Sequence, residues 1–160
     1  MDEDAYREVY KEVNSNRCVF EKAINNRRCD CEKKIRKLIA TREAIGCQSL
    51  VDLAYCTEFL DTMRKKARFS LRVVTIDGPM PHNKELQVQA GGCLQLQKIL
   101  FPEEAAVCAD TVYEQSPAAT NIYAIVNAAL KKYGRIEQFP YGEIVQGIVN
   151  YKSRKKRKRS

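Results

Sequence analysis

The sequence predicts a mainly α fold: a small helical domain with a cysteine-rich N-terminal half, a β-hairpin in the middle and a disordered basic C-terminal tail. Three observations predict it. Apolar residues recur at helical spacing along most of the chain, residues 70–90 contain a β-branched and then an alternating stretch, and residues 152–160 contain no apolar side chain. With 160 residues, of which 44% are hydrophobic, the chain can bury a core without disulfides.

The N-terminal half is expected to consist of short helices joined by loops. The first helix covers residues 4–14, and a second begins after turn formers and carries Phe20 and Ile24. The stretch "NNRRCDC" indicates a loop, and residues 32–44 have the spacing of a further helix. Ser49 can cap the next helix, with Asp52 at the third helical position, and the apolar face of that helix extends to Met63.

The second half is expected to begin with the hairpin. Its strands are "SLRVVTI" and "ELQVQA", joined by the turn-rich loop "DGPMPHN", and the second strand ends at Gly91 and Gly92. Three helices follow: one from Pro102 to Tyr113, one that opens at Ser116 and Pro117 and closes at Gly134, and one over residues 141–151. The globular domain therefore spans residues 1–151. Within it, residues 17–72 form a basic cysteine-rich region, and residues 73–151 form the hairpin and helical part.

The positive charge is segregated along the chain. Residues 17–72 contain 14 Lys or Arg against 7 Asp or Glu, and residues 152–160 contain 7 Lys or Arg and no acid, whereas the formal net charge of the whole chain is +8. The rest of the chain is therefore acidic. Such segregation is typical of a protein that binds a polyanion or compensates a buried anion.

Five of the seven cysteines lie within 39 residues, at positions 18, 29, 31, 47 and 56. Four thiolates can ligate either tetrahedral zinc or one [4Fe–4S] cluster. Zinc sites usually contain a C-x₂₋₄-C pair, and none occurs here, so the spacing favours the iron–sulfur cluster, with zinc as second choice. The spacing resembles that of the helical cluster modules of iron–sulfur helicases and primases, although no residue correspondence supports this likeness and helicase nucleotide motifs are absent.

The candidate metal ligands are Cys18, Cys29, Cys31, Cys47 and Cys56. Cys18, Cys47 and Cys56 are the preferred three, and either Cys29 or Cys31 completes the set. Basic neighbours on both sides of these residues favour the thiolate form. The alternatives are inert core thiols and redox or disulfide chemistry. Cys93 and Cys108, on apolar helical faces, are expected to pack in the core.

No catalytic constellation stands out, so the sequence does not indicate an enzyme. His82 is expected in the hairpin loop, and no nucleophile signature links it to Cys93. The Gly91–Gly92 pair lacks a phosphate-binding pattern. The acidic N-terminus is not a secretory signal, and no apolar run is long enough to cross a membrane, which predicts a cytoplasmic protein, or a nuclear one in a eukaryotic host.

The leading hypothesis is a small iron–sulfur protein that binds nucleic acid. The alternatives are an electron-transfer or cluster-delivery protein that docks on an acidic protein, and a metal-free nucleic-acid or protein adaptor. Phe69 in "RKKARFSLR" is either a stacking ring among phosphate-binding cations or an inward-facing core residue. The candidate nucleic-acid contacts are Arg64, Lys65, Lys66, Arg68, Lys152, Arg154, Lys155, Lys156, Arg157, Lys158 and Arg159.

Overall fold

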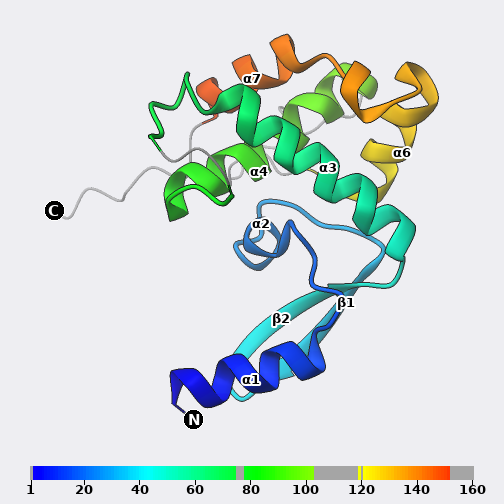
Figure 1. Ribbon diagram of the computed structural model, residues 1–160. Helices are drawn as coiled ribbons and strands as arrows, with labels where there is room; N and C mark the ends of the chain where they lie inside the picture. Colours follow the sequence, from blue (N-terminus) through cyan, green and yellow to red (C-terminus); the bar gives the residue numbers. More distant parts are fainter. Residues whose placement is uncertain (1, 75–77, 103–118, 120, 152–160) are drawn as a thin grey trace, which may run out of the picture.

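The computed structural model describes residues 2–74, 78–102, 119 and 121–151, and within them the chain is mainly α-helical with one small β-hairpin (Figure 1). This confirms the predicted fold class in outline. In chain order the elements are α1 (Glu3–Val13), α2 (Glu21–Asn25), β1 (Lys34–Ile39), β2 (Arg42–Cys47), α3 (Leu50–Ala67), α4 (His82–Leu100), α6 (Ile122–Tyr133), the short 3₁₀ helix η1 (Ile136–Gln138) and α7 (Tyr141–Asn150).

The longer helices form a body, and the N-terminal elements form an arm beneath it (Figure 1). In the body α4 packs against α7, α6 and α3, and α3 also contacts α7. The arm consists of the antiparallel β1–β2 hairpin with α1 lying against β1. The short helix α2 contacts both β2 and α4, so it joins the arm to the body.

Helix α4 runs through the core. Its glycines allow very close packing: a Cβ on Gly92 would lie 2.2 Å from the sulfur of Met63, and one on Gly91 would lie 2.8 Å from Cβ of Tyr151. Aromatic rings pack one turn earlier on α3, where the ring centroids of Phe59 and Phe139 are 5.5 Å apart. The core therefore combines tight helix contacts with an aromatic cluster.

The expected position of the hairpin was wrong. The hairpin lies at residues 34–47, where a helix was expected over 32–44. Ile39 pairs with Arg42, so only Ala40 and Thr41 form the turn, and Ala40 adopts a φ of 56°. A turn of this kind usually carries Gly or Asn, so Ala40 and Thr41 provide no hairpin signal, and the apolar spacing of residues 32–44 favours a helix instead. Leu38 is 73% exposed rather than part of a helical core face.

The stretch expected to form the second strand of the hairpin is instead the first part of α4. Its alternation of apolar and polar residues was misleading because the polar side chains are buried as well. Gln89 accepts a hydrogen bond from the Ala23 N–H (3.1 Å) and donates one to the Val19 carbonyl (3.2 Å). A helix with satisfied polar groups in the core shows little amphipathic periodicity. Gly91 and Gly92 consequently lie inside a helix, and His82 is its first residue rather than a loop residue.

Several local signals are confirmed. The Ser49 hydroxyl accepts a hydrogen bond from the Asp52 N–H (3.3 Å) and caps α3. Gly134 follows α6 with a φ of 85°, which favours glycine. Helices α1, α2 and α7 also lie close to their expected positions. The end of the first expected strand at 75–76, most of the helix expected after Pro102, the Ser116–Pro117 helix start and the tail lie outside the described residues.

Candidate metal centre

The described residues include six of the seven cysteines, and all six are free thiols. Cys108 lies outside them. The six thiols fall into two groups by burial: four are partly buried and two are buried. We call Cys18, Cys31, Cys47 and Cys56 the four-thiol group, and Cys29 with Cys93 the buried pair.

The four-thiol group is assembled from four separate segments. Cys18 precedes α2, Cys31 lies between α2 and β1, Cys47 ends β2, and Cys56 lies inside α3. The pKa of Cys56 is raised by burial first and then by the other three thiols, which are therefore its electrostatic neighbours. Folding thus brings these four sequence-predicted candidates into one region.

Backbone pairing fixes Cys18 beside Cys47. The Cys18 N–H donates to the Ile45 carbonyl (2.9 Å), and the Cys47 N–H donates to the Asn16 carbonyl (2.8 Å), so residues 16–18 run antiparallel to the end of β2. Gly46 lies between these bonds, where a Cβ would be 2.6 Å from Oδ1 of Asn14. The absence of a side chain at position 46 therefore lets the first segment approach β2.

The loop that carries Cys31 is held by the start of α6. The Asp30 N–H donates to the Ala119 carbonyl (3.1 Å), and the Ile122 N–H donates to the Asp30 carbonyl (2.9 Å). The Asn121 side chain accepts a hydrogen bond from the Glu32 N–H (3.2 Å) and does not cap α6. These contacts place Cys31 at the N-terminal end of α6.

Cys47 and Cys56 are linked through the cap of α3. The Cys47 thiol donates to the Ser49 carbonyl (3.2 Å), and Ser49 is the N-cap of α3. Because Cys56 lies two turns into this helix, the capped start of α3 sets its position relative to Cys47. The capping prediction from the sequence therefore concerns the site as well as the fold.

Backbone amides support two of the thiols. Burial raises the pKa of the Cys18 thiol to about 12, although the Phe20 N–H, which donates to this sulfur, opposes the rise. Burial also raises the pKa of Cys31, and the N–H groups of Lys33 and Tyr123, which donate to its sulfur, oppose it. Tyr123 lies in the first turn of α6, where amides have no helical partner. Both sulfurs therefore have donors that stabilise a thiolate once a cation is present.

The buried pair lies deeper in the core than the four-thiol group but adjoins it. Cys29 is 5% exposed and pairs with Ala119 in a β-bridge, and Cys93 on α4 is fully buried. The pKa of Cys93 is raised by burial first, then by a hydrogen bond with Cys29 and the charge of Cys29, and after these by Cys56 and Cys18. Cys29 and Cys31, which the sequence could not distinguish, therefore have different main partners. The predicted core position of Cys93 is observed, whereas its pairing with Cys29 had no signal in the sequence.

The basic residues next to the cysteines are partly paired with acids. Arg17 pairs with Glu21 (3.4 Å), Lys34 pairs with Asp30, and the Lys33 ammonium lies 4.8 Å from the Tyr123 ring centroid. Within the described ranges, no three or more His, Cys, Asp or Glu side chains are grouped so that they could hold a metal ion. The four thiols are thus electrostatic neighbours without forming a single-ion cage.

The candidate nucleic-acid residues have unequal environments. Arg64 is largely buried and its guanidinium binds Glu85 on α4 and Asp61 on α3, whereas Lys65 and Lys66 are exposed. Arg68 donates to the Gly78 carbonyl (3.4 Å). The candidates in the tail lie outside the described residues.

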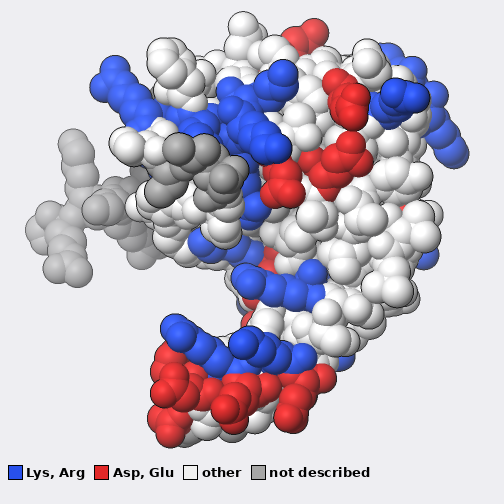
Figure 2. Space-filling model, viewed as in Figure 1, with Lys and Arg blue, Asp and Glu red and all other residues white. Residues whose placement is uncertain are grey.

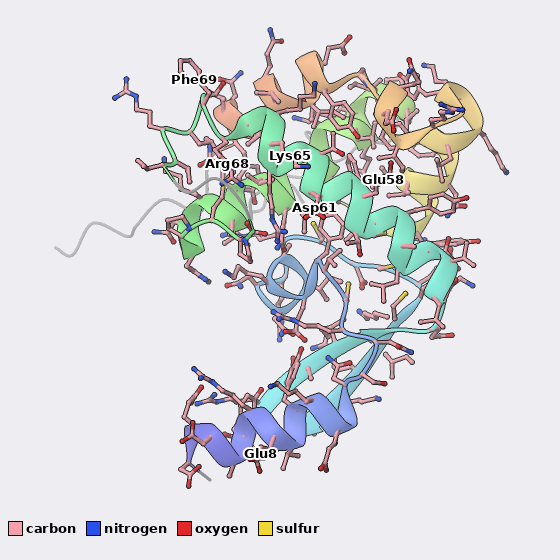
Figure 3. The ribbon with its side chains drawn as sticks, in the orientation of Figure 1. Glu8, Glu58, Asp61, Lys65, Arg68 and Phe69 are labelled. Carbon is pink, nitrogen blue, oxygen red and sulfur yellow. The ribbon has the colours of Figure 1, made fainter. Side chains whose placement is uncertain are left out.

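Charge is also segregated on the surface. Figure 2 shows Lys and Arg on both sides of the hollow between the arm and the body, and Asp and Glu along the outer side of the arm. That outer side belongs to α1, whose Glu8 points away from the hairpin in Figure 3. The basic side of the arm thus faces the body.

Comparison with known proteins identifies neither a family nor a relative. No protein-family model matches the sequence, and no significant match is found among curated proteins or solved structures. No helix in the described part of the chain is long and apolar enough to cross a membrane. The functional interpretation therefore depends on the residues themselves.

Proposed function

We propose that this protein binds an iron–sulfur cluster, with zinc as second choice, through Cys18, Cys31, Cys47 and Cys56. One observation carries the proposal: thiols from four separate segments are electrostatic neighbours, so the fold concentrates the ligand type that both iron–sulfur clusters and zinc require. An inert core rarely needs four cysteines in one place, and apolar side chains would fill the same space at no risk of oxidation.

The sequence spacing favours the cluster over zinc, because the chain contains no C-x₂₋₄-C pair of the kind that zinc sites usually contain. In the described residues no group of three or more His, Cys, Asp or Glu side chains could hold a metal ion as the side chains stand. Either centre would therefore require the segments that carry Cys18, Cys31, Cys47 and Cys56 to close further.

The chain would contribute more than ligands. The Phe20, Lys33 and Tyr123 amides donate to the Cys18 and Cys31 sulfurs, and such donors stabilise ligating thiolates and tune a cluster's potential. The four thiols are partly buried, which limits their contact with water. The chain holds Cys31 through the start of α6 and Cys47 through β2, so cluster binding would link the arm to the body.

The charge segregation supports an acidic partner, with nucleic acid as the leading candidate. Lys and Arg collect around the hollow of Figure 2, and residues 152–160 add 7 more without an acid. An electron-transfer or cluster-delivery protein that docks on an acidic protein would use the same charge, and so would a metal-free adaptor. The electron-transfer or cluster-delivery alternative differs from the leading proposal in having negligible affinity for nucleic acid. The adaptor differs from it in containing no metal.

Anaerobic purification tests the metal centre first. We expect a brown protein that contains iron and acid-labile sulfide and absorbs in the visible range. A colourless protein with stoichiometric zinc would establish the second choice. A folded protein with neither metal, after reconstitution with iron and sulfide and separately with zinc, would disprove the centre and leave the adaptor.

A further inference from the structure

Phe69 is an aromatic ring on the surface, with 93% of the residue exposed. It lies two residues after the last residue of α3, in a turn that continues the helical path, and Figure 3 shows it at the end of this helix. Ala67 and Leu71, on either side in sequence, are 0% and 5% exposed. Because successive helical residues are about 100° apart, burial of Ala67 and Leu71 directs Phe69 to the opposite side. The inward-facing interpretation of Phe69 is therefore excluded.

The backbone after α3 holds the ring in this place. The Val73 N–H donates to the Arg68 carbonyl (3.0 Å), and the Arg72 N–H donates to the Phe69 carbonyl (3.1 Å). Arg72 has a φ of 56°, so the pattern is a Schellman motif with Arg72 as its left-handed residue. The turn satisfies the carbonyls at the helix end, and Phe69 is presented by a defined backbone.

Three exposed cations lie close to Phe69 in sequence. Lys65 and Lys66 precede it by four and three residues, which are the spacings of neighbours on a helix surface, and Arg72 lies in the turn that follows, where its N–H donates to the Phe69 carbonyl. No ion pair within the described residues involves any of the three, in contrast to Arg64. We call Lys65, Lys66, Phe69 and Arg72 the Phe69 platform.

Acidic groups lie beside the platform. Glu58 and Asp61 lie earlier on α3, as Figure 3 shows, and Asp61 pairs with Arg64 (3.1 Å). Glu58, Asp61 and Glu137 line the same cavity as Lys65. Lysines near the end of a helix also favour its macrodipole, so their presence alone would not indicate a ligand. An exposed ring among unpaired cations does indicate a ligand, because exposing a phenyl group to water does not stabilise the fold.

We propose that the Phe69 platform binds single-stranded nucleic acid: Phe69 stacks on an unpaired base, and Lys65, Lys66 and Arg72 contact the flanking phosphates. Aromatic stacking needs a free base face, which a single strand offers and the interior of a duplex does not. An anionic membrane fits less well, because one ring buries too little apolar area for stable anchoring. The inference rests on the nucleic-acid part of the proposed function and does not depend on the metal centre.

Fluorescence anisotropy of the full-length protein with labelled oligothymidylate, and with the same strand in a duplex, tests the platform. Phe69→Ala is expected to weaken single-strand binding by about 5- to 150-fold, the equivalent of one stacked base, and to change duplex binding little. Phe69→Tyr keeps an aromatic face and should retain most of the affinity, whereas Phe69→Leu, which is apolar but not aromatic, should resemble Phe69→Ala.

Two matched controls separate the effects of stacking and of local charge from the effect of removing any exposed apolar side chain or any lysine. Val74 is 94% exposed close to the platform, so Val74→Ala removes a similarly exposed apolar side chain and should leave binding unchanged. Lys131 is an exposed lysine in the last turn of α6, and Lys131→Ala should have less effect than Lys66→Ala on both the affinity and its salt slope. Because all these side chains are exposed, unfolding midpoints should match that of the wild type.

The outcomes are distinguishable. Unchanged single-strand affinity in folded Phe69→Ala would overturn the platform and leave nucleic-acid binding intact. No measurable binding of either probe by wild type near physiological salt would overturn both the platform and the nucleic-acid part of the proposed function. Phe69-dependent binding to phosphatidylserine vesicles without single-strand binding would show a membrane surface instead.

Discussion

Cys29 and Cys93 are hydrogen-bonded in the core, and Cys31, only two residues after Cys29, belongs to the four-thiol group. The two neighbouring cysteines are therefore separated by their environments. Cys29 pairs with α4 through Cys93, whereas Cys31 is held at the start of α6. This division determines which of them should ligate the proposed cluster.

Cys31→Ser should lower metal content, and Cys29→Ser should leave it close to that of the wild type. Loss of one ligand weakens a metal centre whose binding is coupled to folding. Iron, sulfide and zinc per chain in anaerobically purified variants provide the measurement. Equal loss in both variants, with both folded, would contradict the division into two groups.

Gly46→Ala should destabilise the protein by about 1–3 kcal/mol, because the added Cβ would lie 2.6 Å from Oδ1 of Asn14. Asn14 cannot easily turn away, since its amide nitrogen donates to Tyr10 (2.9 Å) and to the Ile45 carbonyl (3.0 Å). Urea unfolding measures the change. A Cβ on Gly142 meets nothing within 4 Å, so Gly142→Ala is the control and should be neutral or slightly stabilising.

Arg64→Met should cost about 3–5 kcal/mol at neutral pH, because it leaves the Glu85 carboxylate buried without its cation. Burial alone would raise the pKa of Glu85, but hydrogen bonds from Arg64, the Met80 N–H and Gln89 and the charge of Arg64 lower it overall. The double variant Arg64→Met, Glu85→Gln should recover part of the loss. Urea unfolding of the wild type and the two variants measures both effects.

The pH dependence of this pair has a defined sign. In the wild type, the stabilisation from Glu85 ionisation is present above its unfolded pKa of about 4.3 and is lost as the pH falls through the lower folded value. In Arg64→Met, burial dominates and the pKa of Glu85 should rise, so acid neutralises the unpaired charge. The stability difference between wild type and Arg64→Met should therefore narrow as the pH falls, and a constant difference would contradict a charge effect.

A chain that stops after Tyr151 should keep its unfolding midpoint and metal content but bind nucleic acid more weakly. The removed residues 152–160 contain no apolar side chain, and their 7 cations would release counterions on binding phosphate. The slope of log affinity against log salt should become shallower, with little change in sequence preference. The electron-transfer alternative instead predicts negligible nucleic-acid binding by both forms and slower reduction by an acidic protein partner after truncation.

Local features of the fold could be predicted from the sequence better than long-range ones. Ser49 and Gly134 act through their immediate neighbours, so a cap and a helix end could be inferred from single positions. The hairpin turn at Ala40 has no Gly or Asn, and α4 buries Gln89 through distant partners, so both elements escaped prediction. In each case tertiary contacts outweighed the local pattern.

In the candidate site, too, local features could be predicted from the sequence and long-range contacts could not. Spacing identified the cysteine-rich segment, and Cys18, Cys47 and Cys56 were the preferred ligands before the structure placed them near Cys31. The choice between Cys29 and Cys31 depends on Cys93 and on the start of α6, which lie more than 60 residues away in sequence. Likewise, Arg64 could be recognised as an ion-pair partner only once α3 and α4 were packed together.

The most direct test of the metal centre is the iron and sulfide content of Cys18→Ala, Cys47→Ala and Cys56→Ala beside the wild type and Cys93→Ala, all purified without oxygen. Each of the first three should lose metal and stability, because each removes a thiol of the four-thiol group. Cys93→Ala should keep the wild-type metal content, since Cys93 belongs to the buried pair. Full metal retention in all three four-thiol variants would contradict the proposed centre.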